Sequence, residues 1–235
     1  VLTPEAAAMG FSNEGTIQGT FRPLRTIIGM WIIQECRRDW IKAGMDISWD
    51  EVVNQARAAE PLRSIIDPDA PEFYAGGNME KKIQDFCRRT NQPVPETVGQ
   101  IARTVYESLA LKYRHALEGL EKMKGQRIDS LNIVGGPINN RFLDQLIADS
   151  LDRQVVTGPI EGAAMGNLLT QAMALGDIAN LEELRQVAIE ALDTCENRNI
   201  RDWSSIKSTI KGSLSNYLYK KTKRNPMILP IIMET

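Results

Sequence analysis

The chain has 235 residues, of which 43% are hydrophobic and 25% are charged, and its formal net charge is −2. This size allows one large domain or two small ones, each with a buried core. A charge so close to zero creates no strong field toward nucleic acid or an anionic membrane, so we expect neither as a partner. Apolar runs extend for only a few residues, far short of the roughly 18 that a membrane-spanning helix needs.

The three cysteines, Cys36, Cys87 and Cys195, are too few and too scattered to form a disulfide framework. No His or Cys lies near them at a spacing typical of metal ligands, so we expect core or surface thiols and no metal site. The first residues also lack the pattern of a secretory signal. Together these features predict a cytoplasmic protein with reduced thiols.

The first third of the chain is predicted to be loop followed by helices. Residues 1–20 are rich in Gly, Ser and Thr, which indicates a loop with a short strand. Residues 24–40 carry apolar side chains at helical spacing and predict a helix. The next helix, over 49–59, follows Ser48, which forms a capping box with Glu51.

Proline, aspartate and glycine then interrupt the pattern over 61–78, which predicts an irregular loop. A helix is predicted over 79–89. A turn at 91–96 leads into a long helix that ends near Lys122, shortly before a glycine.

Residues 131–167 alternate strand, glycine turn, helix, strand and helix. The first strand ends at Gly135 and Gly136, where a bare backbone can turn sharply and approach a flat ligand. Asn140 is expected to cap the helix that follows, and the second strand begins at Val155. This alternation predicts an α/β fold. On its own, a strand followed by two glycines fits a plain strand-to-helix connection equally well.

Read together, VGG at 134–136, QLIAD at 145–149 and GPIE at 158–161 resemble the C-terminal domain of rhamnulokinases, a branch of the FGGY family of carbohydrate kinases. The segment at 11–40 agrees, and the resemblance runs over residues 1–187. It implies a C-terminal nucleotide-side domain, one half of an actin-like, ribonuclease-H-like fold. In that fold, two such domains close around nucleotide and sugar.

The sequence changes character after about residue 187. KTKRNPMILPIIME at 221–234 is similar to the C-terminal end of bacterial ribonuclease J, so residues 188–235 read as part of a second protein joined near 185–190. Within this tail we expect an amphipathic helix and then a strand over 227–233. Such an apolar edge strand needs a cover, and we expect a second copy of the chain to supply it.

The rival to a kinase domain is therefore a ribonuclease J-type interaction module that mediates self-association. Nuclease activity is not expected, because the metal-binding HxHxDH motif of ribonuclease J is absent from the sequence. The residues upstream of Val1 would discriminate between the two hypotheses. The origin of the join near 185–190 stays open.

The rhamnulokinase resemblance implies a transferase that uses ATP and Mg²⁺ to phosphorylate L-rhamnulose or a similar ketose. Such a reaction needs a base, donors around the phosphates and closure that excludes water. The family's base is an Asp in an HDT motif, but the one histidine here, His115, is followed by Ala116. The glycine-rich phosphate loop is also missing from these 235 residues. We therefore expect no catalytic residue in the chain and no activity from it alone.

The same resemblance assigns Gln34, Gly135, Gly136 and Asn140 to ATP and Thr26 to the sugar. Alternatives remain for two of them. Gln34 also fits a solvent-facing residue on a helix, and Asn140 fits a simple helix cap.

Two positions depart from the family pattern. Pro137 replaces the third glycine of the usual VGGG; it lacks an N–H and fixes φ near about −65°. Thr26 stands where rhamnulokinases usually carry a sugar-binding asparagine, and a hydroxyl reaches less far than an amide. These changes leave the adenosine contacts and the choice of sugar open.

Two further groups have competing interpretations. Asp67 and Asp69 could hold a metal, but an Asx turn is favoured for closely spaced aspartates in such a loop. The basic run at 220–224 could touch RNA, but a solvated helix end, where cations suit the helix dipole, is favoured.

Overall fold

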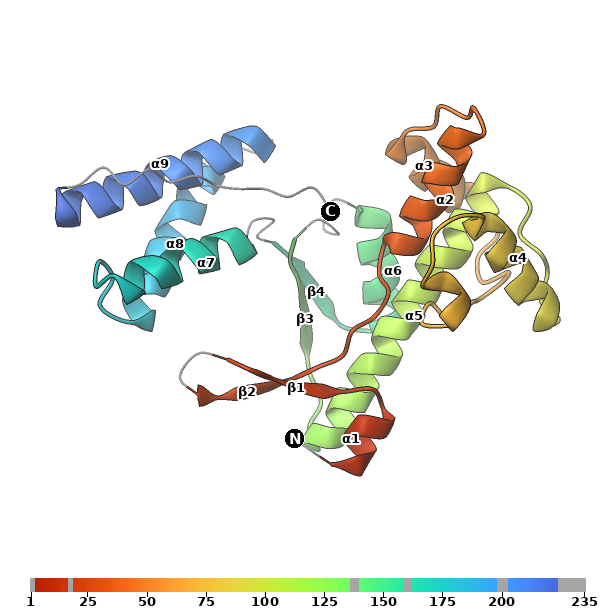
Figure 1. Cartoon of the computed structure of the whole chain (residues 1–235), viewed down its shortest axis with the longest axis horizontal. Helices are drawn as coiled ribbons and strands as arrows, with labels where there is room; N and C mark the ends of the chain where they lie inside the picture. The colour runs from red at the N-terminus through yellow and green to blue at the C-terminus, as the bar shows by residue number, and fades with distance from the viewer. Residues whose placement is uncertain (1–2, 17–18, 136–139, 159–161, 198–202, 224–235) are drawn as a thin grey trace. The chain divides into compact units, whose positions relative to one another are not determined.

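The computed structural model describes residues 3–16, 19–135, 140–158, 162–197 and 203–223. These residues form two compact units (Figure 1). Unit 1 comprises residues 1–132 and 139–156, and unit 2 comprises 133–138 and 157–235.

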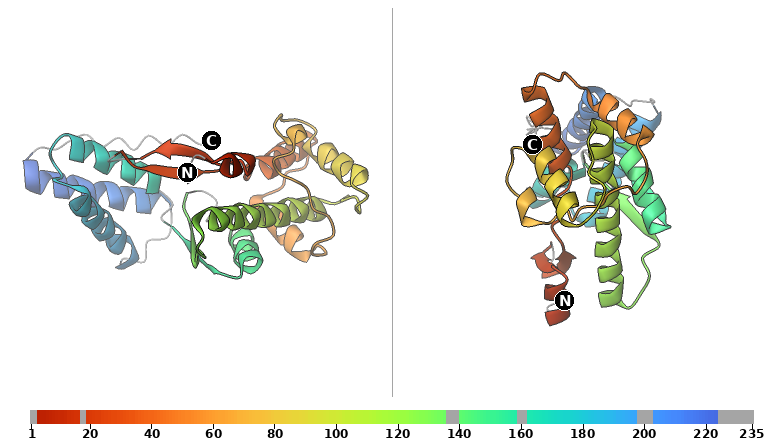
Figure 2. Two further views of the ribbon diagram at one scale, coloured as in Figure 1. Left: turned by 90° about the horizontal axis from the view of Figure 1, so that it is seen from below. Right: turned by 90° about the vertical axis from the view of Figure 1, so that its right-hand side faces the viewer.

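Unit 1 is organised around the long helix α5 (Val98–Lys124). Helices α3 (Trp49–Ala58) and α6 (Arg141–Leu151) pack directly against it, and Figure 2 shows α6 lying along α5. Helix α2 (Trp31–Lys42) packs on α4 (Met79–Arg89) and also touches α5. Large side chains that are fully buried form this core: Ile32, Val52, Phe73, Ile83, Ile101, Tyr106, Leu109 and Leu143.

Local signals in the sequence fix the ends of these helices. The Ser48 hydroxyl accepts a hydrogen bond from the Glu51 N–H at 3.2 Å, and the Glu51 carboxylate accepts one from the Ser48 N–H, as the capping-box pattern predicts. Helix α5 begins with an equivalent box at Thr97 and ends at Gly125, which adopts a left-handed φ of +67°. The predictions for 49–59, 79–89 and the long helix are confirmed.

The prediction of a helix over 24–40 is wrong for its first seven residues, 24–30. Helix α2 begins only at Trp31, because residues Phe21–Leu24 form strand β2. This strand pairs antiparallel with β1 (Ser12–Gly15), and Leu24 lies opposite Ser12. The backbone of residue 24 is thus committed to a partner 12 positions away, which helical periodicity does not reveal.

The N-terminal segment also contains more structure than the predicted loop with one strand. A short helix, α1 (Pro4–Ala8), precedes β1. The Thr3 hydroxyl caps it by accepting a hydrogen bond from the Ala6 N–H at 3.2 Å, and Pro4 suits its first turn.

A second sheet confirms the α/β prediction for residues 131–167. Strands β3 (Ser130–Ile133) and β4 (Gln154–Thr157) pair, and helix α6 connects them. The Gly158 N–H donates to the Ile133 carbonyl at 2.8 Å where the pairing ends. The irregular loop at 61–78 is likewise confirmed, with one short 3₁₀ turn, η2 (Pro71–Phe73).

Unit 2 contains helices α7 (Gly162–Ala174), α8 (Leu181–Asn197) and α9 (Trp203–Thr222), with α8 packed on both of the others. The helix predicted for the tail is therefore confirmed as α9. Helix α8 runs without interruption through the proposed join at 185–190. Unit 2 has a small apolar core, which comprises Leu169, Ala172, Ile178, Leu184 and Val187.

Contacts between α8 and α9 cross the proposed join in sequence. The Tyr217 ring packs on the apolar core of unit 2, and its hydroxyl donates to the Glu183 carboxylate at 2.5 Å. Lys221 forms an ion pair with the same carboxylate, also at 2.5 Å. The strand predicted over 227–233 lies outside the described residues. In the part of the chain that is described, no helix is long and apolar enough to cross a membrane.

Candidate functional site

Unit 1 contains an open hollow of about 600 Å³. This volume lies within the range of roughly 300–1,000 Å³ that is typical of small-molecule sites. Thr26, the residue predicted to face the sugar, is exposed in it. The residues that line the hollow come from four separate parts of the chain: Gly10, Arg25, Thr26, Ile27, Ile28, Trp31, Asp69 and Tyr74.

Polar contacts behind the hollow hold one side of it in place. The Ile28 N–H donates to Asp69 Oδ1 at 3.1 Å, and Lys112 Nζ lies 2.8 Å from Asp69 Oδ2 and 2.7 Å from Asp67 Oδ1. Although burial opposes its charge, hydrogen bonds with the two aspartates raise the pKa of Lys112 above its ordinary value. Lys112 therefore contacts both carboxylates, and its single positive charge offsets one of their two negative charges.

The Asp69 N–H also donates to Asp67 Oδ1 at 3.1 Å, which confirms the predicted Asx turn. These carboxylates are thus structural groups. Throughout the described segments, no group of three acidic, His or Cys side chains is placed to hold a metal ion.

A buried carboxylate on α2 holds the loop that carries Tyr74. Glu35 is 3% exposed, and its Oε2 accepts a hydrogen bond from the Gly77 N–H at 3.2 Å. A Cβ at Gly76 would lie 2.3 Å from the same oxygen, so only glycine allows this approach. The loop that carries Tyr74 is therefore anchored directly on α2. The sequence analysis missed this contact, although the glycine pair two residues after Tyr74 marks it.

The residues predicted to face ATP lie in different places. Gln34 is half-buried on α2, three residues after Trp31, and Asn140 lies at the start of α6; both belong to unit 1. Gly135 belongs to unit 2 and has a φ of +83°, which favours glycine. A Cβ there would meet no atom within 4 Å, so its side is open. Gly136 lies outside the described residues.

Asn140 does act as a helix cap, as one of its two interpretations requires. Its side-chain oxygen accepts a hydrogen bond from the Leu143 N–H at 3.1 Å. This bond uses one of the two lone pairs of the oxygen, and the amide nitrogen is the group that could donate to a nucleobase.

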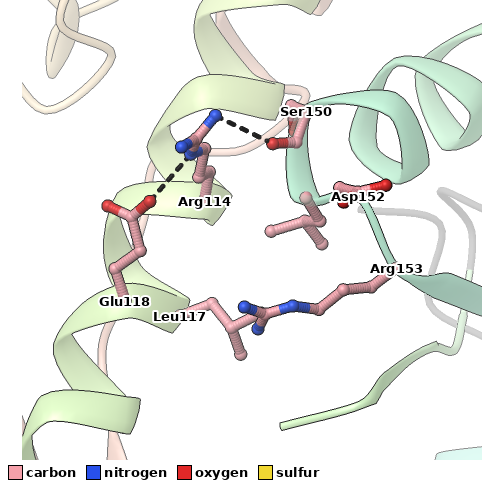
Figure 3. A pocket seen from close by; sticks show the side chains of 7 residues that line it. Arg114, Leu117, Glu118, Ser150, Asp152 and Arg153 are labelled. Atoms are coloured by element: carbon pink, nitrogen blue, oxygen red, sulfur yellow. Dashed lines mark hydrogen bonds and ion pairs between the residues drawn. The ribbon is translucent and has the colours of Figure 1, made fainter. Parts of the chain in front are cut away.

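A second, smaller pocket of about 90 Å³ lies between α5 and the end of α6 (Figure 3). Its two arginines are already paired: Arg114 with Glu118 at 2.7 Å and with the Ser150 carbonyl at 3.2 Å, and Arg153 with Glu121 at 2.7 Å. The pocket is too small for a nucleotide or a sugar. We interpret it as part of the joint between α5 and α6.

The cysteines described in unit 1 are core residues. Cys36 and Cys87 are both free thiols with no exposed surface. Burial raises the pKa of each thiol above its ordinary value, so neither is poised as a thiolate nucleophile.

Comparison with known families gives two matches. The model of the C-terminal domain of the FGGY family of carbohydrate kinases matches residues 2–175. The model of the ribonuclease J C-terminal domain matches residues 167–235. The two matches overlap within α7.

Several rhamnulokinases are similar to most of the chain. The enzyme of Bacteroides thetaiotaomicron is 39% identical over 207 residues, which cover 87% of this chain and 42% of that protein. The enzyme of Bacillus subtilis is 37% identical over 187 residues, 80% of this chain and 38% of that protein. The enzyme of Enterococcus faecalis is 35% identical over 223 residues, 94% of this chain and 44% of that protein. The chain thus spans about two fifths of the length of the curated relatives it matches.

Proposed function

Because the chain belongs to the FGGY family of carbohydrate kinases, we propose that it forms the C-terminal part of an ATP-dependent kinase that phosphorylates L-rhamnulose or a closely similar ketose. The observation that carries this proposal is the similarity to rhamnulokinases, at 35–39% identity in the three relatives above. A sugar kinase works where ATP is available, and we infer a cytoplasmic location.

In this proposal the chain supplies binding groups, and the reacting groups come from elsewhere in the enzyme. Thr26 is exposed in the hollow, where its hydroxyl can both donate to and accept from a sugar hydroxyl. Phosphoryl transfer itself depends on positioning and on neutralising charge at the phosphates. A polypeptide with only these residues should bind ligands weakly, since it lacks the charge-assisted contacts to the phosphates.

Each unit carries proposed nucleotide contacts of its own: the turn after β3 in unit 2 and the start of α6 in unit 1. The open side of Gly135 fits the flat face of adenosine, and the Asn140 amide can donate to an acceptor on the base. Gln34 is proposed to contact ATP from α2. Mg²⁺ would be bound through the ATP phosphates.

A substitution at Asn140 can separate its two roles. Asp is a good helix cap and has the same shape, but its carboxylate has no N–H donor. We expect Asn140→Asp to preserve α6 and to weaken ADP binding several-fold in calorimetry. Gln34→Glu removes the N–H donor of the second contact in the same way and should also weaken ADP binding. Full ADP affinity in both variants would argue against these residues as nucleotide ligands.

For residues 188–235 a second function is favoured by the match to the ribonuclease J domain: self-association. We propose that the segment 227–233 pairs with a second copy of the chain. Light scattering on the full chain and on a form ending at Lys223 tests this proposal, because that form keeps α9. A dimer that becomes a monomer on truncation supports it, and a monomer in both cases contradicts it.

A further inference from the structure

Two aromatic side chains form one wall of the hollow in unit 1. Trp31 and Tyr74 both line it, and their exposed fractions are 36% and 60%. Ile27 and Ile28 add apolar surface, so a large part of the lining cannot hydrogen-bond. Large aromatic side chains left in contact with solvent at a hollow are typical of ligand contacts, since they combine an apolar face with a polar edge.

Hydrogen bonds fix the two aromatic residues relative to each other. The Trp31 indole N–H donates to the carbonyl of Phe73, the residue directly before Tyr74, at 3.2 Å. Beyond Tyr74, the Gly77 N–H is held by Glu35 at 3.2 Å. The backbone around Tyr74 is therefore tied to α2 on both sides. Such a wall is organised before any ligand arrives, which reduces the entropy lost on binding.

Two charged residues line the hollow, Asp69 and Arg25, and the buried Nη1 of Arg25 has no hydrogen-bond partner in the described part of the chain. Asp69 is paired with Lys112 at 2.8 Å and also accepts the Ile28 N–H. The Arg25 guanidinium lies over the Phe11 ring, with 5.9 Å between Cζ and the ring centroid. The Thr26 hydroxyl and the aromatic and aliphatic surface thus line the same hollow, which suits a ligand that carries both polar and apolar groups.

We propose that Tyr74, supported by Trp31, is a specificity-determining residue that contacts the apolar end of the ketose and selects a sugar with a C6 methyl group over one with a C6 hydroxyl. This inference rests on the proposed function, because it places the ketose in the hollow beside Thr26. The physical reason is desolvation: a hydroxyl pressed against an aromatic face loses water and gains no partner there. A methyl group in the same place loses nothing and buries apolar area.

The selectivity should be moderate. Even an enclosed apolar pocket rejects an added hydroxyl by only about a hundredfold, and this hollow is open. We therefore expect a preference of several-fold. Glu35 is a positioning residue in this account, because it touches the loop and not the sugar.

The test compares L-rhamnulose with L-fructose, which differ only in the hydroxyl at C6. Both are titrated into the full chain and followed by chemical-shift perturbation at Thr26, Ile28 and Tyr74. The ratio of the two dissociation constants is the quantity of interest. Wild type should prefer L-rhamnulose several-fold, Tyr74→Phe should keep this preference, and Tyr74→Ala should bring the ratio close to one.

Matched controls separate contact from fold. Tyr219→Ala removes a tyrosine of similar exposure, 46%, from unit 2 and should leave the ratio unchanged. Glu35→Gln keeps an acceptor for the Gly77 N–H and should retain the preference, whereas Glu35→Ala should reduce it. Tyr74 is 60% exposed, so its replacement by Ala should not impair folding.

The outcomes distinguish this inference from the function on which it rests. If both sugars bind at the hollow and Tyr74→Ala leaves the wild-type ratio intact, the selectivity proposal is wrong while the sugar site stands. If neither sugar perturbs Thr26 or its neighbours at the highest concentration that can be dissolved, the ketose does not bind in the hollow. The inference about Tyr74 then fails as well.

Discussion

The two units are stabilised in different ways. Unit 1 has a core of large side chains with no exposed surface, such as Tyr106 and Leu109, around one long helix with defined caps at both ends. Unit 2 has a smaller core, in which α9 is held partly by an ion pair at its surface, Glu183 with Lys221. The candidate sugar site lies in unit 1, where packing is dense enough to fix a binding wall. In unit 2, α8 and α9 pack on each other, and both lie within the match to the ribonuclease J C-terminal domain.

The largest expected effect is on the cores. Leu109→Ala in unit 1 and Leu169→Ala in unit 2 each remove a side chain that is at most 2% exposed, and each should destabilise its own unit by about 2–5 kcal/mol. Amide hydrogen exchange can follow both units in one sample. We expect Leu109→Ala to lower protection in α3, α5 and α6 and Leu169→Ala to lower it in α7 and α8. Equal loss of protection in both units from either change would show that they unfold as one body.

A matched pair of glycine substitutions should give opposite signs in the two units. In α5 of unit 1, a Cβ at Gly99 would lie 2.5 Å from the Gln55 carbonyl oxygen, so Gly99→Ala should destabilise by about 1–3 kcal/mol through overpacking. In α9 of unit 2, a Cβ at Gly212 would meet nothing within 4 Å, so Gly212→Ala should stabilise the helix by about 0.5–1 kcal/mol. Thermal denaturation measures both; a stabilising effect at Gly99 would contradict the close helix crossing.

The smallest effect concerns the surface contact between α8 and α9. Hydrogen bonds from Lys221 and Tyr217 lower the pKa of Glu183 from its ordinary value of 4.5 to about 2. A carboxylate with a lowered pKa stabilises the folded state above its unfolded pKa, and this contribution disappears as the pH falls toward the folded value. We expect the protection of α9 against exchange to fall between about pH 4.5 and pH 2.

Two variants test the origin of this pH dependence: Glu183→Gln removes the carboxylate, and Glu182→Gln, at the adjacent position, is the control. Glu183→Gln should weaken the protection of α9 at neutral pH and remove much of its change on acidification. Glu182→Gln should have little effect, since Glu182 is 87% exposed and its nearest cation is 3.9 Å away. An unaltered acid response in Glu183→Gln would rule out this contact as its origin.

The sequence predicted those parts of the fold that depend on local signals. Capping residues such as Ser48 and Thr97 act within one helical turn, so the helices they begin were placed correctly. The start of α2 was misplaced because Leu24 pairs with β1 as the last residue of β2, and residues 25–30 are not helical although apolar spacing continues through them. Position within a sheet depends on distant residues, and a single periodic pattern does not encode it.

In the candidate site, too, local signals were predictable from the sequence and contacts between distant residues were not. Thr26 was proposed from its place in a family pattern and lines the hollow, and Asn140 was predicted as a cap from its position before a helix. Tyr74 and Glu35 were missed, because the contact that matters joins a loop to a helix about 40 residues earlier, here the Gly77 N–H and Glu35, 42 positions apart. Only the folded structure brings Thr26 and Tyr74 to one hollow and ties the loop of Tyr74 to Glu35.

The central claim is that this chain carries the nucleotide and sugar contacts of a carbohydrate kinase on its kinase-like residues and none on its tail. Chemical-shift mapping of the full chain with ADP tests it most directly. We predict weak binding with perturbations centred on Gly135, Asn140 and Gln34, and no phosphorylation of L-rhamnulose by the chain alone. Perturbations confined to α9, with none at Gly135 or Asn140, would contradict the account.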